Sequence, residues 1–266
     1  MTDKVFQKLV WEFYKKNKRS FPWRETNDPY AIFISEVMLQ QTQAPRVVAK
    51  FVAFMKKFPT VQKLAQAKDA EVIREWQGLG YNRRALNLVR AAREIVARHN
   101  GAVPRDTEAL VALPGIGPYT AAAIRSFAFN SDAVVIETNI RSVYIHYFFA
   151  GRLTKVIDAE LLPIIERTFP NGYAREWYSA LMDLGASLKK EGKGSPSKTK
   201  IYTKQSTFKG SNRALRGMIL REAARKFFDA KNFRAVGYST NQIYQVITDM
   251  TKEGFLVEKK GKIQLK

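Results

Sequence analysis

LPGIGPYTAAAIRSFAFNSDAVVIETN, residues 113–139, combines a tight glycine turn with a helix of small residues. Gly115 and Gly117 lack side chains, so backbone N–H groups in the turn can approach a ligand closely, and the following helix adds the positive end of its dipole. This combination suits a phosphate group. The turn is too short for a Walker loop and lacks the third glycine of a dinucleotide-binding motif. Two helices joined by a hairpin that grips a nucleic-acid backbone fit better than either of these motifs. The glycines alone favour a plain helix corner, so the rest of the chain decides between the two.

The net charge supports a nucleic-acid partner. The 266 residues carry a formal charge of +21, with a pI of about 10.1, which favours a polyanion: nucleic acid or an acidic membrane surface. No apolar run reaches transmembrane length, and the N-terminus shows an amphipathic helix pattern without a signal-peptide core. We therefore expect nucleic acid rather than a membrane, and a cytoplasmic location, associated with the nucleoid in a bacterium.

The composition also limits the chemistry. The sequence has no cysteine, which excludes disulfides, thiolate zinc sites and cysteine-ligated iron–sulfur clusters. His99 and His146 are the two histidines of the chain, so a histidine-based metal site or catalytic triad is disfavoured. We expect no metal site, and we expect catalysis to depend on carboxylates.

The hydrophobic spacing predicts helices throughout residues 1–188, with no alternating strand pattern. A second glycine turn, Gly78-Leu79-Gly80-Tyr81, precedes another helix, consistent with paired backbone grips. The expected helices cover approximately 5–17, 30–43, 45–58, 60–67, 69–77, 82–99, 104–112, 119–124, 139–149, 158–169 and 174–188.

The composition changes after residue 188. Residues 189–205 are basic and contain Gly, Ser and Pro, typical of a linker or loop. Residues 206–266 predict helices at 212–228 and 241–252, then a hairpin of 255–258 with 262–265. This order predicts a winged-helix-like DNA-binding domain. Residues 189–266 hold 19 Lys and Arg against 6 Asp and Glu, and the predicted phosphate contacts among them are Lys198, Lys200, Lys204, Lys259 and Lys260.

Glu36 lies within an apolar helix pattern, YAIFISEVMLQQTQ at 30–43. The ordinary interpretation is a surface glutamate on an amphipathic helix. The functional interpretation is a carboxylic acid whose pKa is raised by burial, so that it can donate a proton near neutral pH. The polar run Gln40, Gln41, Thr42 and Gln43 favours the second interpretation, because such side chains at a helix end are suited to hydrogen-bonding base edges.

Four motifs together resemble the MutY-type adenine-DNA glycosylases of the helix–hairpin–helix superfamily. They are SFPWRETNDPYAIFISEVMLQQTQ at 20–43, WQGLGYNRRALNL at 76–88, LPGIGPYTAAAI at 113–124 and ALMDLGA at 180–186. The resemblance covers roughly residues 5–188. It implies a mainly α fold: a two-lobed helical glycosylase domain at 1–188, a basic linker at 189–205 and the small winged-helix-like α+β domain at 206–266.

The resemblance also implies roles for the acidic residues. Glu36 would protonate the excised adenine, at N7. Glu137 and Asn139 fall where the family places a catalytic aspartate and a nearby asparagine. Tyr119 falls where bifunctional relatives carry a Schiff-base lysine, and a tyrosine cannot form that imine. The expected activity is therefore that of a monofunctional glycosylase, which leaves an abasic site without cutting the strand.

Further positions follow from the matching motifs. The resemblance implies DNA contacts by Gln40, Gln41, Thr42, Gly78, Gly80, Tyr81, Gly115 and Gly117. It implies a base pocket formed by Trp23, Arg24, Met182 and Asp183. No cofactor is needed, although the hairpin leaves room for a monovalent cation.

Three departures from the family pattern stand out. Glu137 replaces the expected aspartate, and its extra methylene could move the carboxylate by about 1 Å, an error that can cost about 100-fold in rate. The family's four-cysteine cluster motif is replaced by lysines, which we expect to take over the DNA contact. A Nudix-like domain that reads 8-oxoguanine is not part of the predicted tail, which leaves the opposite-base preference open.

The leading hypothesis is thus a base-excision repair enzyme that acts as a monomer on mismatched double-stranded DNA. It would remove adenine opposite 8-oxoguanine or guanine, by flipping the base out of the stack. One alternative is a mismatch thymine/uracil-DNA glycosylase with the same fold. Another is a non-catalytic protein that binds mismatched DNA.

Overall fold

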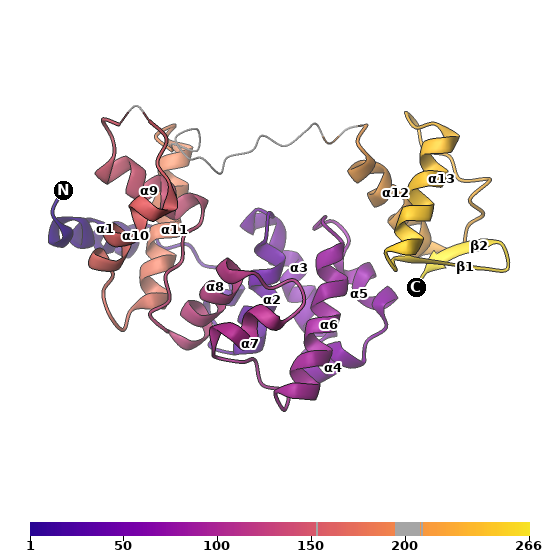
Figure 1. The fold of residues 1–266 in the computed structure, drawn as a ribbon, viewed down its shortest axis with the longest axis horizontal. Coiled ribbons are helices and arrows are strands. Elements are labelled where there is room, and N and C mark those ends of the chain that lie inside the picture. Colours follow the sequence, from indigo (N-terminus) through magenta and orange to yellow (C-terminus); the bar gives the residue numbers. More distant parts are fainter. Residues whose placement is uncertain (153, 195–207, 209) are drawn as a thin grey trace. The chain divides into compact units, whose positions relative to one another are not determined.

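The computed structural model describes residues 1–152, 154–194, 208 and 210–266 (Figure 1). These residues form two compact units, and each unit draws on two separate parts of the sequence. The first joins Met1–Gln40 to the described part of Ala102–Thr203, and the second joins Gln41–Gly101 to the described part of Lys204–Lys266. The described residues are mainly helical, with one small antiparallel sheet, which confirms the predicted fold class.

The named elements of the first unit, within its described residues, are all helices joined by loops. Its core lies between three helices: the N-terminal helix, the helix that follows Glu137 and the last helix of the unit. Phe6, Tyr144 and Trp177 are fully buried in this core. The elements are α1 (Asp3–Asn17), the 3₁₀ turn η1 (Pro22–Arg24), α2 (Pro29–Leu39), α7 (Thr107–Ala112), α8 (Pro118–Phe129), α9 (Thr138–Phe148), α10 (Asp158–Thr168) and α11 (Ala174–Lys190).

Local sequence signals set where these helices begin. The Asp28 carboxylate accepts a hydrogen bond from the backbone of Tyr30 at 3.0 Å, and Pro29 occupies the first turn of α2. Asp106 caps α7 in the same way, accepting from the Ala109 backbone at 2.7 Å. The helices α7 and α8 pack against each other across the glycine turn, so the predicted pair of helices joined by a hairpin is present.

One glycine allows two helices of this unit to approach closely. Gly185 lies within α11, and a Cβ placed there would come 2.4 Å from the Asn139 carbonyl oxygen and 2.6 Å from the Asn139 Cβ, in the first turn of α9. Both distances are far shorter than non-bonded contacts in proteins. The packing of α9 against α11 therefore requires glycine at this position.

The second unit combines helices from the middle of the chain with the C-terminal segment. The helices of residues 41–101 are α3 (Ala44–Lys57), α4 (Val61–Gln66), α5 (Asp69–Trp76) and α6 (Arg83–Arg98). The C-terminal elements are α12 (Asn212–Arg225), α13 (Thr240–Lys252), β1 (Leu256–Lys259) and β2 (Lys262–Leu265). In Figure 1, α12, α13 and the two strands lie next to one another.

The C-terminal segment shares its core with α5 and α6. Ile73 and Leu86 belong to the same buried cluster as the apolar residues of α12, α13 and the strands. Polar contacts cross the same junction: Gln77 donates to the Leu220 carbonyl at 3.2 Å, and Arg74 donates to that of Ala224 at 3.3 Å. The domain boundaries predicted from the sequence, at residues 188 and 205, remain a prediction. The contacts in the structure place residues 210–266 in one compact unit with the helices of residues 41–101.

A charged cluster reinforces this junction. The Glu253 carboxylate forms ion pairs with Arg216, at 2.5 Å, and with Arg83 of α6, at 2.8 Å. These two partners hold the pKa of Glu253 below its usual value. Because Arg83 belongs to α6 and Arg216 to α12, the cluster connects the two sequence segments of the unit.

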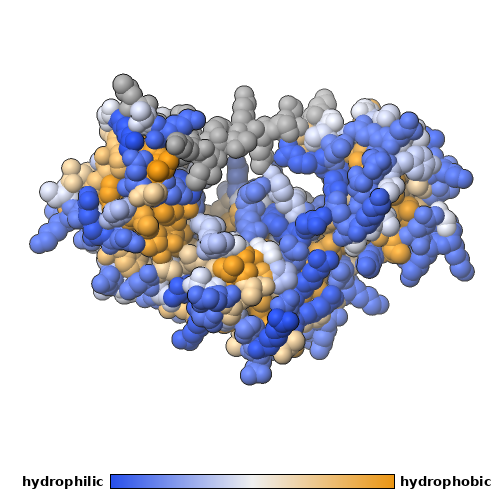
Figure 2. Space-filling model, viewed as in Figure 1, coloured by the Kyte–Doolittle hydropathy of each residue, from blue (hydrophilic) through white to orange (hydrophobic). Residues whose placement is uncertain are grey.

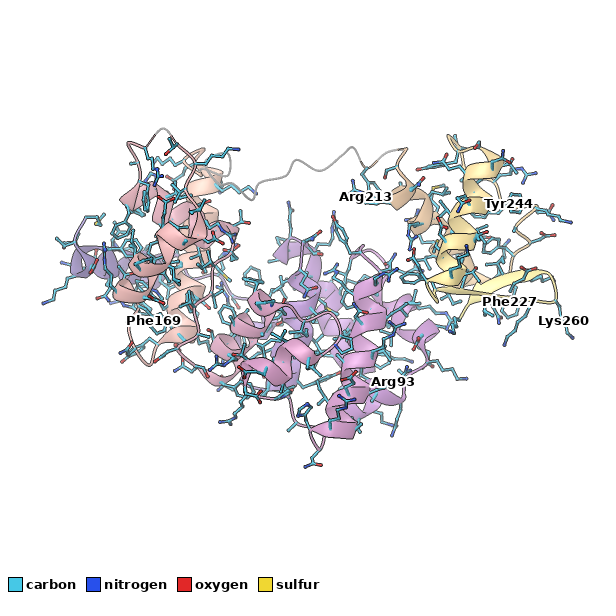
Figure 3. All side chains as sticks on the ribbon, viewed as in Figure 1. Arg93, Phe169, Arg213, Phe227, Tyr244 and Lys260 are labelled. Atoms are coloured by element: carbon cyan, nitrogen blue, oxygen red, sulfur yellow. The ribbon has the colours of Figure 1, made fainter. Side chains whose placement is uncertain are left out.

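The predicted hairpin is present, with its turn at Lys260 and Gly261. Their φ values of 52° and 74° match the left-handed turn that suits the twist of paired strands. Lys259 and Lys260 are exposed, and Lys260 lies at the tip of the hairpin (Figure 3). The predicted helix at 212–228 ends earlier, at Arg225, because the backbone of Phe228 pairs with Ile263 of β2.

The surface of the C-terminal elements is largely hydrophilic in the view of Figure 2. Within the part of the chain that the structure describes, no helix combines the length and the apolar character needed to cross a membrane. The predicted linker begins within α11, which extends to Lys190, and Lys198, Lys200 and Lys204 lie outside the described residues.

Replacing Gly185 with alanine should destabilise the protein. The added Cβ must displace the Asn139 backbone, and such overpacking costs about 1–3 kcal/mol, or roughly 2–4 °C in Tm for each kcal/mol. Gly217→Ala is the matched control, because Gly217 also lies inside a helix but a Cβ there meets nothing within 4 Å. We expect this control to be neutral or stabilising by up to about 1 kcal/mol. Thermal unfolding followed by circular dichroism tests both, and equal Tm values for the two variants would contradict the close contact.

Candidate active site

Glu36 lies inside α2 and is 8% exposed, among apolar neighbours such as Phe33 and Val37. Burial raises its pKa to about 8, and the nearby charge of Glu137 adds to this rise, whereas Arg24 opposes it. Among the described residues, none donates a hydrogen bond to Glu36. The side chain is therefore a carboxylic acid that holds its proton near neutral pH.

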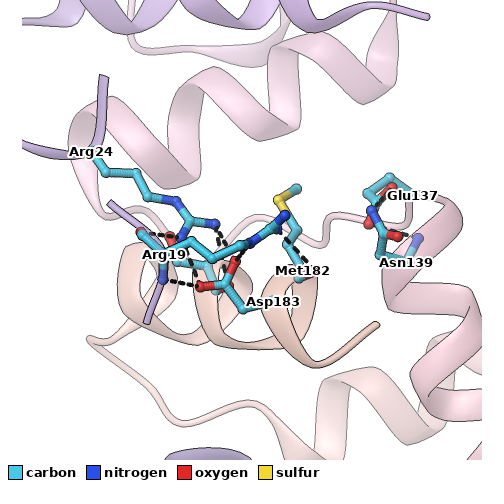
Figure 4. Close-up of polar contacts among 7 residues, drawn as sticks. Arg19, Arg24, Glu137, Asn139, Met182 and Asp183 are labelled. Atoms are coloured by element: carbon cyan, nitrogen blue, oxygen red, sulfur yellow. Dashed lines mark hydrogen bonds and ion pairs between the residues drawn. The ribbon is translucent and has the colours of Figure 1, made fainter. Parts of the chain in front are cut away.

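Glu137 occupies the N-cap position of α9. One carboxylate oxygen accepts hydrogen bonds from the backbone N–H groups of Asn139, at 2.7 Å, and Ile140, at 3.0 Å. The other oxygen accepts from the Asn139 side chain at 3.2 Å (Figure 4). Burial raises the pKa of Glu137, while these hydrogen bonds and the charge of Arg141 oppose the rise.

The two carboxyl groups thus have opposite environments. Glu36 is surrounded mainly by apolar side chains, whereas Glu137 accepts three hydrogen bonds at the positive end of a helix. Hydrogen bonds to a carboxylate stabilise its charged form, so the first proton taken up by the pair goes to Glu36. A neutral acid beside an anchored anion is the division of roles that acid-assisted bond cleavage requires.

Tyr119 lies in the first turn of α8, and its side chain interacts with both acids. Burial of its hydroxyl raises the pKa of Tyr119 well above the usual value, and the charges of Glu36 and Glu137 raise it further. Arg141 opposes this effect and is itself held by Asp158, through two hydrogen bonds of 2.7 Å. Although Tyr119 is 40% exposed as a whole, its hydroxyl stays protonated and can act as a hydrogen-bond donor.

Arg24 is held beside Glu36 by a buried carboxylate. Asp183 of α11 is 3% exposed and accepts two hydrogen bonds from the Arg24 guanidinium, at 2.9 and 3.0 Å. It also accepts from the backbone and the side chain of Arg19, at 2.9 and 2.6 Å (Figure 4). Asp183 therefore fixes the segment before α2, and Met182 contributes its carbonyl oxygen to Arg19 at 3.4 Å.

Trp23 lies in the same segment and is 7% exposed. Its ring stacks on that of Phe21, with the centroids 5.0 Å apart and the planes within 4° of parallel. The guanidinium groups of Arg19 and Arg24 each lie 5.2 Å from the centre of the Phe21 ring. The predicted pocket residues Trp23 and Arg24 are therefore ordered by stacking and cation–π contacts as well as by Asp183.

The glycine turn between α7 and α8 is connected directly to the end of α2. The side-chain amide of Gln40 donates to the Gly115 carbonyl at 3.2 Å and to the Thr120 hydroxyl at 3.0 Å. Gly115 is exposed, and its φ of 82° is a conformation that glycine adopts without strain. Gly117 caps α8, and the space beside it is open. No side chain of the described residues blocks the approach to the backbone at the two glycines, as phosphate binding requires.

The second glycine turn lies in the other unit, and Arg84 organises it. The Arg84 guanidinium donates to the Gly80 carbonyl and the Thr42 hydroxyl, both at 3.0 Å, and lies 5.7 Å from the centre of the Tyr81 ring. Tyr81 and Gln41 are exposed and have left-handed backbones, with φ values of 48° and 54°. Such conformations are strained for non-glycine residues and occur preferentially at functional sites.

The structure brings together part of the predicted site. Glu36, Glu137, Asn139, Tyr119, Arg24 and Asp183 lie in the first unit, with Trp23, Met182, Gln40, Gly115 and Gly117. Gln41, Thr42, Gly78, Gly80, Tyr81, Lys259 and Lys260 lie in the second. Among the described residues, no group of three or more His, Asp or Glu could hold a metal ion.

Three positioning residues were missed by the sequence interpretation: Arg19, Arg84 and Arg141. Arg19 precedes the quoted motif, and its partner Asp183 is 164 positions away, so no local pattern indicates the pair. Arg84 and Arg141 lie within three residues of the predicted Tyr81 and Asn139, and this proximity was the available signal.

Comparison with known proteins identifies the family. A model of the HhH-GPD superfamily base excision DNA repair protein matches residues 34–166. The adenine DNA glycosylase of Buchnera aphidicola subsp. Baizongia pistaciae is 35% identical over 189 residues, which make up 71% of this chain and 54% of that protein. The chain thus spans about half the length of this relative.

Two further likenesses concern thymine and uracil. The thymine/uracil-DNA glycosylase of Methanothermobacter thermautotrophicus is 32% identical over 188 residues, covering 70% of this chain and 85% of that protein. The solved structure of a thermostable thymine-DNA glycosylase matches with a TM-score of 0.66 and 31% identity, over 74% of this chain and 92% of that chain. These findings confirm the resemblance drawn from the four motifs. The chain belongs to the HhH-GPD superfamily of base excision DNA repair proteins.

Proposed function

We propose that the protein is a monofunctional DNA glycosylase that hydrolyses the N-glycosidic bond of a mispaired adenine in double-stranded DNA. The observation that carries this proposal is the buried, protonated Glu36 beside the anchored carboxylate of Glu137. The relatives named adenine DNA glycosylase support the choice of base. We further propose that the enzyme acts as a monomer and that its guanine or 8-oxoguanine preference is set by contacts opposite the adenine.

Glu36 supplies the proton in this mechanism. Cleavage of the glycosidic bond transfers electrons to the departing base, and protonation of the base, at N7 for adenine, makes it a better leaving group. A carboxylic acid with a pKa of about 8 is largely protonated at pH 7 and can still give up its proton in the transition state. The extrusion of the base from the stack costs a few kcal/mol, and this cost is lower at a mismatch.

Glu137 stabilises the positive charge that develops on the sugar. Its carboxylate is fixed by three hydrogen bonds, so it needs no reorganisation when that charge forms. A carboxylate offers about four acceptor positions, which leaves capacity for a water molecule as the nucleophile. The replacement of aspartate by glutamate is tolerated in this proposal because the longer side chain still caps its own helix.

Tyr119 supports the absence of strand cleavage. Its protonated phenol cannot form the imine through which a lysine would cleave the strand. In our proposal the hydroxyl donates a hydrogen bond in the site, and water completes the reaction. The products are the free base and an abasic site.

A mismatch thymine/uracil-DNA glycosylase is the second candidate. The likeness to the thymine/uracil-DNA glycosylase extends over 85% of that protein, compared with 54% of the relative named adenine DNA glycosylase. Such an enzyme would use the same acidic pair with a pocket that accepts a pyrimidine. The four-substrate assay below separates the two candidates.

Glu36→Gln should abolish base release while leaving DNA binding intact. The amide keeps the size of the side chain but has no acidic proton to donate, and the loss of a general acid typically costs about 10²–10⁴-fold in rate. Single-turnover assays with excess enzyme measure the rate, and fluorescence anisotropy measures binding. Glu12→Gln is the matched control, because Glu12 is exposed on α1. Equal rates for wild type and Glu36→Gln would exclude Glu36 as the acid, and binding without base release by either would favour the non-catalytic alternative.

The rate of base release should depend on pH through Glu36. The active form combines protonated Glu36 with ionised Glu137, so we expect the rate to decline above about pH 8, as Glu36 loses its proton, and to fall again at acidic pH, as Glu137 takes one up. The stability of the protein provides an independent measurement. Because the folded state binds a proton between pH 4.5 and 8 that the unfolded state has lost, the free energy of unfolding should fall as pH rises across this range. Glu36→Gln should reduce this fall, and an identical pH dependence in the variant would contradict the raised pKa.

A four-substrate panel should reveal the excised base. Duplexes with A opposite 8-oxoguanine, A opposite G, T opposite G and U opposite G are incubated with the enzyme and then treated with alkali. We expect cleavage at adenine after alkali, no cleavage without it, and no covalent complex with borohydride. Release of only T or U would exclude the adenine proposal, and strand cleavage without alkali would exclude a monofunctional enzyme.

A further inference from the structure

A pocket of about 390 Å³ lies in the second unit, where the end of α5 meets α12. Its charged lining consists of Arg221, Arg225 and Arg234, together with Glu222. This volume is within the range of sites that hold small molecules or single nucleotide groups. The predicted site residues do not include any member of this lining.

The charges of the pocket are unbalanced. Arg221 and Arg225 are exposed, lie four residues apart on one face of α12, and make no hydrogen bond or ion pair with the described residues. Arg234 donates to the carbonyls of Lys231 and Phe233, which neutralise none of its charge. The Glu222 carboxylate lies 3.4 Å from the Lys226 ammonium and is thus shared with a further cation. Three guanidinium groups beside one shared carboxylate favour the binding of an anion.

Apolar side chains complete the pocket. Met218 and Phe233 are partly buried against the core of the C-terminal segment, and the Phe233 ring lies 5.1 Å from that of Phe228. Guanidinium groups bind phosphate oxygens in a planar, bidentate manner, while an aromatic ring and a thioether suit the sugar or base beside the phosphate. The chemistry of the lining therefore fits a phosphodiester better than a carboxylate or a metal ion.

Hydrogen bonds between the end of α5 and α12 hold the walls of the pocket in place. Gln77 forms part of its wall and donates to the Leu220 carbonyl of α12 at 3.2 Å. Arg74 donates to the Ala224 carbonyl at 3.3 Å, one turn further along. These two hydrogen bonds hold α12 against the end of α5, so Arg221 and Arg225 extend from a helix that is fixed to the opposite wall of the pocket.

We propose that this pocket binds a phosphate of the DNA backbone, so that α12 grips the duplex directly. The proposal rests on the proposed function only in taking DNA as the substrate. It assigns the DNA contact of the C-terminal segment to Arg221 and Arg225 of the helix, in addition to the lysines of the hairpin. In this proposal the packing of α12 against the end of α5 forms the phosphate site, because residues from both line the pocket.

The first test follows the arginine side chains by NMR. The Nε–Hε resonances of Arg221 and Arg225, assigned through single Arg→Gln variants, are recorded with a lesion-free duplex, inorganic phosphate or deoxyadenosine monophosphate. We expect the duplex to shift both resonances at micromolar concentration, and the two small probes to do so only at millimolar concentration. Saturation by the mononucleotide at micromolar concentration would replace the proposal with a free-nucleotide site, and unchanged resonances with the duplex would overturn it.

The second test measures salt dependence. The double variant Arg221→Gln/Arg225→Gln should bind a lesion-free duplex about tenfold more weakly, and the slope of log K against log salt should fall in magnitude by about 1 to 2. Lys56→Gln/Lys57→Gln removes the same charge from exposed positions on α3 and serves as the control. An equal decrease in both double variants would show a general charge effect and overturn the proposal. Neither test needs base release, so a failure of the glycosylase proposal leaves these results interpretable.

Discussion

The packing of α9 directly against α11 depends on the missing side chain of Gly185. This contact fixes the backbone of Asn139, whose N–H and side-chain amide both donate to the Glu137 carboxylate. The position of the Glu137 carboxylate therefore depends on helix packing at Gly185, which reaches it through Asn139. Asp183, two residues before Gly185 on α11, holds Arg24 close enough to influence the pKa of Glu36. One helix thus positions groups on both sides of the acidic pair.

Glu36 and Glu137 carry the same carboxyl group, but their surroundings favour different protonation states. Both are glutamates, and burial raises the pKa of each. Glu137 receives hydrogen bonds from a helix terminus, whereas Glu36 receives none from the described residues and so keeps its proton to higher pH. The difference between an apolar helix interior and a helix N-terminus thus separates an acid from an anion.

Local patterns in the sequence predicted the helices, the hairpin pair around Gly115 and Gly117, and the buried acid. These features depend on hydrophobic spacing, turn chemistry and short motifs, which one segment contains in full. The uses of Gln40 and Asp183 could not be predicted in this way. Gln40 holds the glycine turn to α2 across 75 positions, and Asp183 binds arginines about 160 positions earlier. Their DNA and base contacts remain predictions, whereas their roles as connectors are visible in the structure.

The shared core of the second unit has a consequence for folding. Ile73 and Leu86 are synthesised early, but the residues that bury them, such as Leu220 and Ile247, follow more than a hundred residues later. During synthesis, the apolar residues of α5 and α6 therefore stay uncovered until residues 102–203 of the other unit and then the C-terminal segment have been made. Contacts of such long sequence separation slow folding and leave apolar surface exposed in the meantime. The nascent chain, more than the finished protein, is thus the form in which this architecture is vulnerable to aggregation.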